Sequence, residues 1–202
     1  IGIGVPGTAN EETGVVEYAN NLLFENVPMR AYLQKKLNKE IDITNDANAA
    51  ALGEVLAGAA KGASNAVAVT LGTGVGGGIV IDGKLFTGFH YGGAELGHMG
   101  IVLGGRKCTC GRRGCLEAYA SPTGLIRSTK EAMDAAPDSL MWELAAENGG
   151  NVSGRTAFLA ADRGDTAAQS VVNAYIEQLG YGLASIINIL APEILVIGGG
   201  VS

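Results

Sequence analysis

The feature that most constrains this chain is a cluster of three cysteines within eight residues: Cys108, Cys110 and Cys115. An odd, local set of cysteines without an export signal favours metal binding over disulfides. A histidine, either His90 or His98, would complete a tetrahedral site of three thiolates and one imidazole, for which zinc is the usual ion. Four protein ligands leave no position for a catalytic water, so the sequence predicts a structural zinc. The alternative is three unmetallated thiols beside a solvated histidine.

Two acidic residues flank this cluster. Glu95 lies three residues before His98, and Glu117 lies two residues after Cys115. A zinc ion joining residues 98 and 115 would bring both carboxylates into one neighbourhood, where they could accept hydrogen bonds from a polyhydroxyl ligand. The alternative is that each is an ordinary surface or helix-start glutamate.

Glycine makes up 32 of the 202 residues, about twice its usual share of roughly 7%. Many glycines gather in residues 72–78, directly after an apolar stretch, and in residues 198–200. Glycines let backbone N–H groups approach phosphate oxygens, and Thr73 adds a hydroxyl donor. The first loop lacks the G-K-[ST] of a P-loop and the helix that follows a dinucleotide fingerprint. For both loops the alternative is a purely structural use of glycine.

Asp46 stands where a predicted strand, residues 41–45, meets a predicted Ala-rich helix, residues 47–59. An acid at this point is most simply the helix N-cap. The alternative is a general base at the carboxyl end of a strand, where α/β sheets bind ligands. The neighbouring Asn45 could hold a hydroxyl group through both a donor and an acceptor. The apolar stripe predicted for the helix comprises Leu52, Val55, Leu56 and Ala59.

The order of the remaining patterns indicates a mixed α/β fold with helices packed on a sheet. Strands are expected at the N-terminus, at residues 66–71, in a hairpin that turns at Asp82-Gly83 and at residues 193–197. Helices are expected at residues 28–37 and over most of residues 121–190, the strongest being 165–190 with Asp165 as its cap. Residues 89–121 form a loop-rich insert. Both ends look cut, so we expect a fragment of a longer protein.

Charge and hydropathy exclude two kinds of partner. The net charge is −6 and no basic run occurs, which argues against a nucleic-acid partner for this portion. The sequence contains no stretch of about 18 uninterrupted apolar residues, so it predicts no membrane span.

Taken together, these motifs resemble the ROK family, the bacterial sugar kinases and related repressors of the actin-like ATPase (ribonuclease H-like) fold. Residues 108–121, CTCGRRGCLEAYAS, match the family's C-x-C-G-x-x-G-C-x-E-x-x-A-S signature. Residues 92–98, GGAELGH, are similar to its E-x-G-H segment. The other matching blocks, in the family's order, are residues 2–7, 45–54, 72–79 and 196–202.

The resemblance implies a role for each candidate residue. Asp46 would be the catalytic base, and the zinc ligands would be His98, Cys108, Cys110 and Cys115, with His98 preferred over His90. The implied sugar ligands are Asn21, Asn45, Glu95, His98 and Glu117, His98 using its second ring nitrogen. The implied contacts to ATP are Gly72, Thr73, Gly74, Gly76 and Gly77 at the phosphates and Gly198, Gly199 and Gly200 at the adenosine.

The resemblance also implies an activity. The whole protein would transfer the γ-phosphoryl group of Mg-ATP to the 6-hydroxyl of a hexose; glucose is favoured, and fructose, mannose, allose and N-acetylmannosamine remain open. The alternative is a sugar-sensing repressor of the same family, whose DNA-binding segment would precede this chain. The family's N-terminal D-x-G-G-T phosphate loop is absent here, so this chain alone should have negligible kinase activity. Residues 1–45 would be the end of a small domain and residues 46–202 a large domain without its last helices. Family members are commonly dimers, so we expect a homodimer. We also expect a cytoplasmic location.

Overall fold

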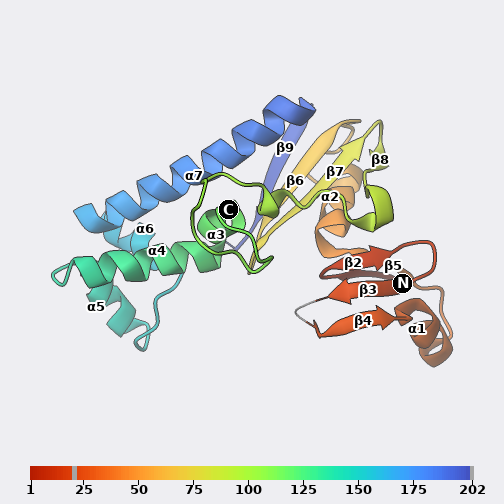
Figure 1. The fold of residues 1–202 in the computed structure, drawn as a ribbon, viewed down its shortest axis with the longest axis horizontal. Coiled ribbons are helices and arrows are strands. Elements are labelled where there is room, and N and C mark those ends of the chain that lie inside the picture. Colours follow the sequence, from red (N-terminus) through yellow and green to blue (C-terminus); the bar gives the residue numbers. More distant parts are fainter. Residues whose placement is uncertain (20–21, 201–202) are drawn as a thin grey trace. The chain divides into compact units, whose positions relative to one another are not determined.

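The computed structural model describes residues 1–19 and 22–200, and the chain forms two compact units (Figure 1). Unit 1 comprises residues 1–70, 76–95 and 192–197, and unit 2 comprises residues 71–75, 96–191 and the segment from residue 198. The expected division at residue 45 concerns the domains of a longer protein, and it stays a prediction.

Unit 1 contains two small sheets in its N-terminal part. β1 (Gly2–Val5) pairs in parallel with β5 (Asp42–Asn45), and Val5 lies opposite Asn45. β2 (Thr8–Asn10), β3 (Val15–Ala19) and β4 (Phe24–Val27) form an antiparallel sheet that the sequence did not predict. α1 (Met29–Leu37) follows and ends at Asn38, which adopts a left-handed conformation. The buried core comprises Val5, Ala9, Val16, Ala19, Ile41 and Ile43.

A four-stranded sheet of order β8-β7-β6-β9 forms the rest of the strand framework. Its strands are β6 (Ala66–Leu71), β7 (Val75–Ile81), β8 (Lys84–Leu85) and β9 (Ile194–Gly199). The predicted hairpin turn is confirmed: Asp82 and Gly83 both have positive φ angles, 51° and 73°, as a type I′ turn requires. β7 and β8 pair antiparallel across it.

α2 (Asp46–Ala57) buries only part of the predicted face: Val55 is half-buried against the cluster of Ala60, Ala66 and Val80. Its buried residues are Ala47, Asn48 and Ala51, while Leu52 and Leu56 are exposed. The reason is the partner strand: a Cβ on Gly78 would lie 2.4 Å from Ala51 Cβ. Glycine on β7 and alanine on α2 therefore allow a close approach that larger residues would prevent.

Unit 2 is mainly helical, as predicted for residues 121–190. Its helices are α3 (Glu117–Ala120), α4 (Pro122–Ala135), α5 (Leu140–Glu147), α6 (Thr156–Asp162) and α7 (Thr166–Leu190). The predicted cap of α7 is confirmed, because Asp165 accepts a hydrogen bond from the Ala168 N–H at 2.8 Å. α7 buries Val171, Tyr175 and Ile186. No helix among the described residues is both long and apolar enough to span a membrane.

Candidate metal and ligand site

The predicted metal ligands come together in unit 2. One nitrogen of His98 and the sulfurs of Cys108, Cys110 and Cys115 all lie within 4.8 Å of one another. The Cys110 and Cys115 sulfurs are 3.7 Å apart, and Cys108 Sγ is 3.6 Å from His98 Nδ1. Tetrahedral zinc with ordinary bond lengths needs separations of about 3.8 Å between sulfurs and about 3.6 Å between sulfur and nitrogen. The donor set therefore fits zinc, with Nδ1 of His98 facing the sulfurs.

Local backbone geometry makes this cluster. Gly111 and Gly114 have φ angles of 87° and 79°, so the chain turns tightly beside the cysteines. A Cβ on Gly114 would lie 1.7 Å from the carbonyl oxygen of Val102. Cys115 pairs with Gly100 in a short antiparallel bridge. The glycines thus let residues 100–102 pack against residues 114–115, and this brings the cysteine side chains close together.

The sulfurs differ in environment. Burial, reinforced by hydrogen bonds with the two neighbouring thiols, raises the pKa of Cys115 to about 12. A hydrogen bond from the Arg112 backbone N–H lowers the pKa of the exposed Cys110. Metal ligation requires thiolates, so binding of an ion would displace the proton that the buried Cys115 retains.

Glu117 begins α3, directly after the cluster. Its Oε1 accepts a hydrogen bond from the Thr109 hydroxyl at 3.1 Å, and its Oε2 accepts one from the Val75 N–H at 3.1 Å. Cys108 Sγ also lies 3.7 Å from Oε1 as a second donor, so the oxygen that keeps a further lone pair is Oε2. The expected contact of Glu117 with a sugar is compatible with this geometry and stays a prediction.

The two glycine loops meet in unit 2. The Gly200 N–H donates to the Leu71 carbonyl oxygen at 3.0 Å, at the point where residues 72–74 begin. Gly199 has a φ angle of 120°, and a Cβ there would lie 2.3 Å from the same oxygen. The Thr123 hydroxyl donates to the Thr73 carbonyl at 2.9 Å. Backbone N–H groups in a converging pair of glycine loops can bind phosphate oxygens.

Gly76, which the resemblance places at the phosphates, has a structural use in unit 1. A Cβ on Gly76 would lie 2.5 Å from the Thr70 hydroxyl and 2.9 Å from Ala47 Cβ. The structural alternative for this glycine is therefore supported by its contacts, and its contact with ATP stays a prediction.

The cap of α2 is Asn45, and not Asp46 as the simplest interpretation of the sequence suggested. Asn45 is the N-cap of α2, because its Oδ1 accepts from the N–H groups of Ala47 and Asn48 at 2.9 and 3.1 Å. The simplest interpretation of Asp46, as the N-cap, is therefore wrong. Asp46 is an exposed residue of the first turn, and among the described residues its Oδ1 accepts only from the adjacent Ala47 N–H.

Asn45 retains less hydrogen-bonding capacity than expected. Its Oδ1 already accepts two bonds, and its Nδ2 donates to the Gly7 carbonyl at 3.0 Å. Its second amide hydrogen has no acceptor among the described residues and could be donated to a ligand. The expectation that Asn45 offers a hydroxyl both a donor and an acceptor is therefore corrected to a donor alone.

The other candidates are placed as follows. Glu95 is exposed and belongs to unit 1. His90 also belongs to unit 1, where its ring packs edge-on against the ring of Phe89 with 4.0 Å between the ring centroids. The histidine in the metal cluster is His98. Asn21 lies outside the described residues.

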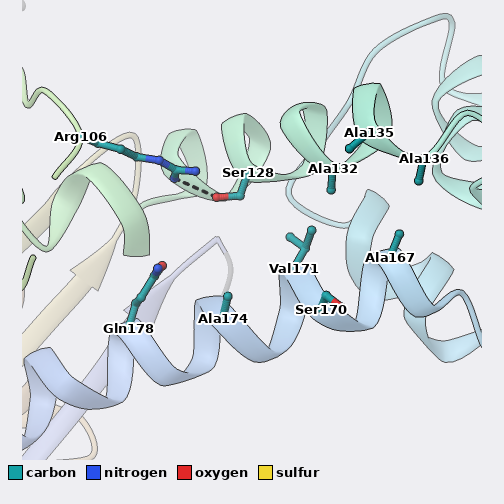
Figure 2. Close-up of a pocket in the computed structure, with 10 residues that line it drawn as sticks. All are labelled: Arg106, Ser128, Ala132, Ala135, Ala136, Ala167, Ser170, Val171, Ala174 and Gln178. Carbon is teal, nitrogen blue, oxygen red and sulfur yellow. Dashed lines mark hydrogen bonds between the residues drawn. The ribbon is translucent and has the colours of Figure 1, made fainter.

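A pocket between α4 and α7 contains none of the candidate residues (Figure 2). Small side chains such as Ala132 and Ala174 line most of it. Its one cation, Arg106, already donates to Ser128 at 2.9 Å and contacts Glu131. The pocket therefore lacks the converging free polar groups of a ligand site.

Comparisons with known proteins agree with these motifs. The ROK family model matches residues 1–202. A glucokinase of Halalkalibacterium halodurans is 40% identical over all of this chain and 61% of its own length. A xylose repressor of Caldicellulosiruptor bescii is 36% identical over 98% of this chain and 49% of its own.

Among solved structures, the ROK family glucokinase from Streptomyces griseus in complex with glucose and AMPPNP has a TM-score of 0.87 and 34% identity, covering 99% of this chain and 65% of that one. The chain therefore has the mixed α/β, actin-like ATPase fold expected from the resemblance. It spans less than two thirds of the length of these relatives.

Proposed function

Because the chain belongs to the ROK family, we propose that the whole protein is an ATP-dependent hexose kinase, with glucose phosphorylated at its 6-hydroxyl. Asp46 is the general base that accepts the hydroxyl proton. Phosphoryl transfer needs an in-line hydroxyl, charge neutralisation and exclusion of water more than covalent help. Mg²⁺ bound with ATP supplies part of that neutralisation.

The observation that carries this proposal is the state of Asp46. Asn45 satisfies the first N–H groups of α2, so the fold does not need the Asp46 carboxylate as a cap. The carboxylate is exposed at the carboxyl end of β5, the end of a parallel strand at which α/β folds place their ligands. A carboxylate that the helix does not need as a cap is available to take a proton.

The remaining candidates divide between recognition and nucleotide binding. Asn45, Glu95, His98 and Glu117, together with Asn21, hold the sugar hydroxyls. Gly72, Thr73, Gly74, Gly76 and Gly77 meet the ATP phosphates, and Gly198, Gly199 and Gly200 approach the adenosine. The meeting of the two glycine loops at Leu71 supports this division. We also propose that the protein is a homodimer.

Zinc in the cluster of His98, Cys108, Cys110 and Cys115 has a structural role. Elemental analysis of the purified chain should find about one zinc per chain, and X-ray absorption should give Zn–S distances near 2.3 Å. A chain that binds no metal, or that joins two of these cysteines in a disulfide, would contradict this part of the proposal.

The test of the activity is a hexose panel on the full-length protein with Mg-ATP. We expect glucose 6-phosphate as the main product, with lower turnover of fructose, mannose, allose and N-acetylmannosamine. The second candidate, a sugar-sensing repressor, rests on the lower similarity to the xylose repressor, 36% identity against 40% for the glucokinase. Sugar binding without phosphorylation, together with sugar-dependent DNA binding, would establish the repressor instead.

A further inference from the structure

The Glu117 carboxylate lies between the metal-ligand loop and the first glycine loop. On one side, Oε1 accepts from the hydroxyl of Thr109, which stands between the ligands Cys108 and Cys110, and Cys108 Sγ is 3.7 Å from the same oxygen. On the other side, Oε2 accepts from the Val75 N–H, where the glycine loop enters β7. One side chain thus touches both segments within unit 2.

The next peptide group, which carries the carbonyl of Val75, is also contacted by the metal-ligand segments. Gly97 immediately precedes the ligand His98, and a Cβ on Gly97 would lie 2.1 Å from the Val75 carbonyl oxygen. The N–H of Val75 therefore meets Glu117 and its carbonyl meets Gly97. Both contacts come from residues attached to the metal-ligand segments, so the position of Val75 depends on where those segments are held.

The loop itself is fitted to the carboxylate. A Cβ on Gly74 would lie 2.2 Å from Glu117 Oε2. Because that oxygen is the end of a flexible side chain, an alanine at residue 74 would push the carboxylate away rather than break the backbone. By contrast, a Cβ on Gly72 would meet nothing within 4 Å. The two glycines therefore offer a matched pair of substitutions, only one of which disturbs Glu117.

From this geometry we propose that metal bound to His98, Cys108, Cys110 and Cys115 sets the position of the loop at residues 72–75 through Glu117. Glu117 is a positioning residue for that loop, in addition to any contact with sugar. A bound ion fixes the spacing of Cys108 and Cys110 and with it the Thr109 hydroxyl, which holds the carboxylate against Val75. Without the ion the same hydroxyl is free to move, and the Val75 hydrogen bond weakens.

The consequence rests on the proposed function, in which this loop meets the ATP phosphates. A metal site with no open coordination position then affects nucleotide binding, although it contacts no nucleotide. The sequence separates the two sites by more than thirty residues, from Val75 to Cys108. The coupling is therefore visible only in the folded arrangement.

The test measures the Val75 amide directly in the chain, with zinc as the only added ligand. Hydrogen–deuterium exchange of ¹⁵N-labelled chain, followed by NMR, is compared in the zinc-loaded and chelator-treated forms. We expect zinc to slow exchange of the Val75 N–H by about tenfold, the factor that an ordinary hydrogen bond provides. Zinc content is measured on each sample by elemental analysis.

Two conservative variants cut the connection on either side of Glu117. Thr109→Val removes the hydroxyl on the metal side, and Gly74→Ala displaces the carboxylate on the loop side. Both should bind zinc in the same proportion as the native chain while Val75 exchange no longer responds to zinc. Gly72→Ala, the control, should keep the native response.

Three results would overturn the proposal. In the first, zinc binds but leaves Val75 exchange unchanged in the native chain, which refutes the coupling and leaves the metal site intact. In the second, both variants retain the full response, so Glu117 is not the connection. In the third, the chain binds no zinc, and the coupling falls together with the metal site while the kinase proposal is still judged by the hexose panel.

Discussion

Two helices, α2 in unit 1 and α7 in unit 2, each have an aspartate at their start, and the sequence pattern predicts both aspartates to be N-caps. Asp165 is the cap of α7: its Oδ1 accepts from the Ala168 N–H, and its Oδ2 accepts from the Ser139 hydroxyl and the Leu140 N–H, both at 2.7 Å. Within residues 1–19 and 22–200, the carboxylate of Asp46 at α2 accepts only from the adjacent Ala47 N–H, because Asn45 is the cap there. An aspartate that the fold uses stabilises the fold, whereas one that the fold leaves unused is available for chemistry.

The largest expected effect on stability is at Asp165. Asp165→Ala removes the cap of α7 and both bonds to the start of α5, so the free energy of unfolding should fall by about 2 kcal/mol, the upper end for a lost cap. Urea denaturation of the chain measures it. A change indistinguishable from zero would show that the two helix starts do not differ.

Asn45→Ala should have a smaller effect, about 1 kcal/mol of unfolding free energy. The substitution removes the acceptor for Ala47 and Asn48 and the donor to Gly7. The same denaturation experiment should show a loss at residue 45 that exceeds the loss for Asp46→Asn. The reverse order would restore Asp46 as the cap.

A pH titration sharpens the comparison further. Burial alone would raise the pKa of Asp165, but hydrogen bonds from Ala168, Ser139 and Leu140 outweigh it and hold the pKa below its usual value. Its contribution to stability is therefore present above the unfolded-state pKa, near 4, and is lost as the pH falls through the lower folded-state pKa. Asp165→Asn should flatten this part of the acid unfolding curve. If the native chain and the variant gave the same acid unfolding curve, the ionised carboxylate of Asp165 would not contribute to the cap.

Local patterns in the sequence account for much of the fold. The strand at 66–71, the Asp82-Gly83 turn and helix α7 were predicted because their signals lie within one element. The convergence of the three cysteines was predicted for the same reason, since they lie within one loop, whereas the choice of His98 over His90 came from the family resemblance. Features whose signals lie within one short segment can therefore be predicted from the sequence.

Other features depend on partners that the sequence does not identify. The sheet β2-β3-β4 was missed because its strands are three to five residues long and carry polar residues such as Asn10 and Glu17. The predicted burial of Leu52 and Leu56 on α2 was wrong. Gly76 and Gly78 of β7 let the helix approach so closely that alanines, and not leucines, fit at the contact.

In the candidate site, Thr109, Thr123 and Gly97 had no distinguishing signal in the sequence. Their contacts to Glu117, Thr73 and Val75 exist only after the chain has folded. The same is true of the capping by Asn45, since either of two adjacent polar residues could have filled that position.

The central claim is that Asp46 acts in catalysis and not in capping, and Asp46→Asn tests it most directly when stability and turnover are measured together. The substitution keeps the size of the side chain and removes only the ionised base. We predict that phosphorylation by the full-length protein falls by roughly 10²–10⁴-fold, the range for a general base. Unfolding free energy should change by less than about 1 kcal/mol, since only a first-turn charge is lost. Turnover near the native rate, with stability reduced as for a lost cap, would contradict the account.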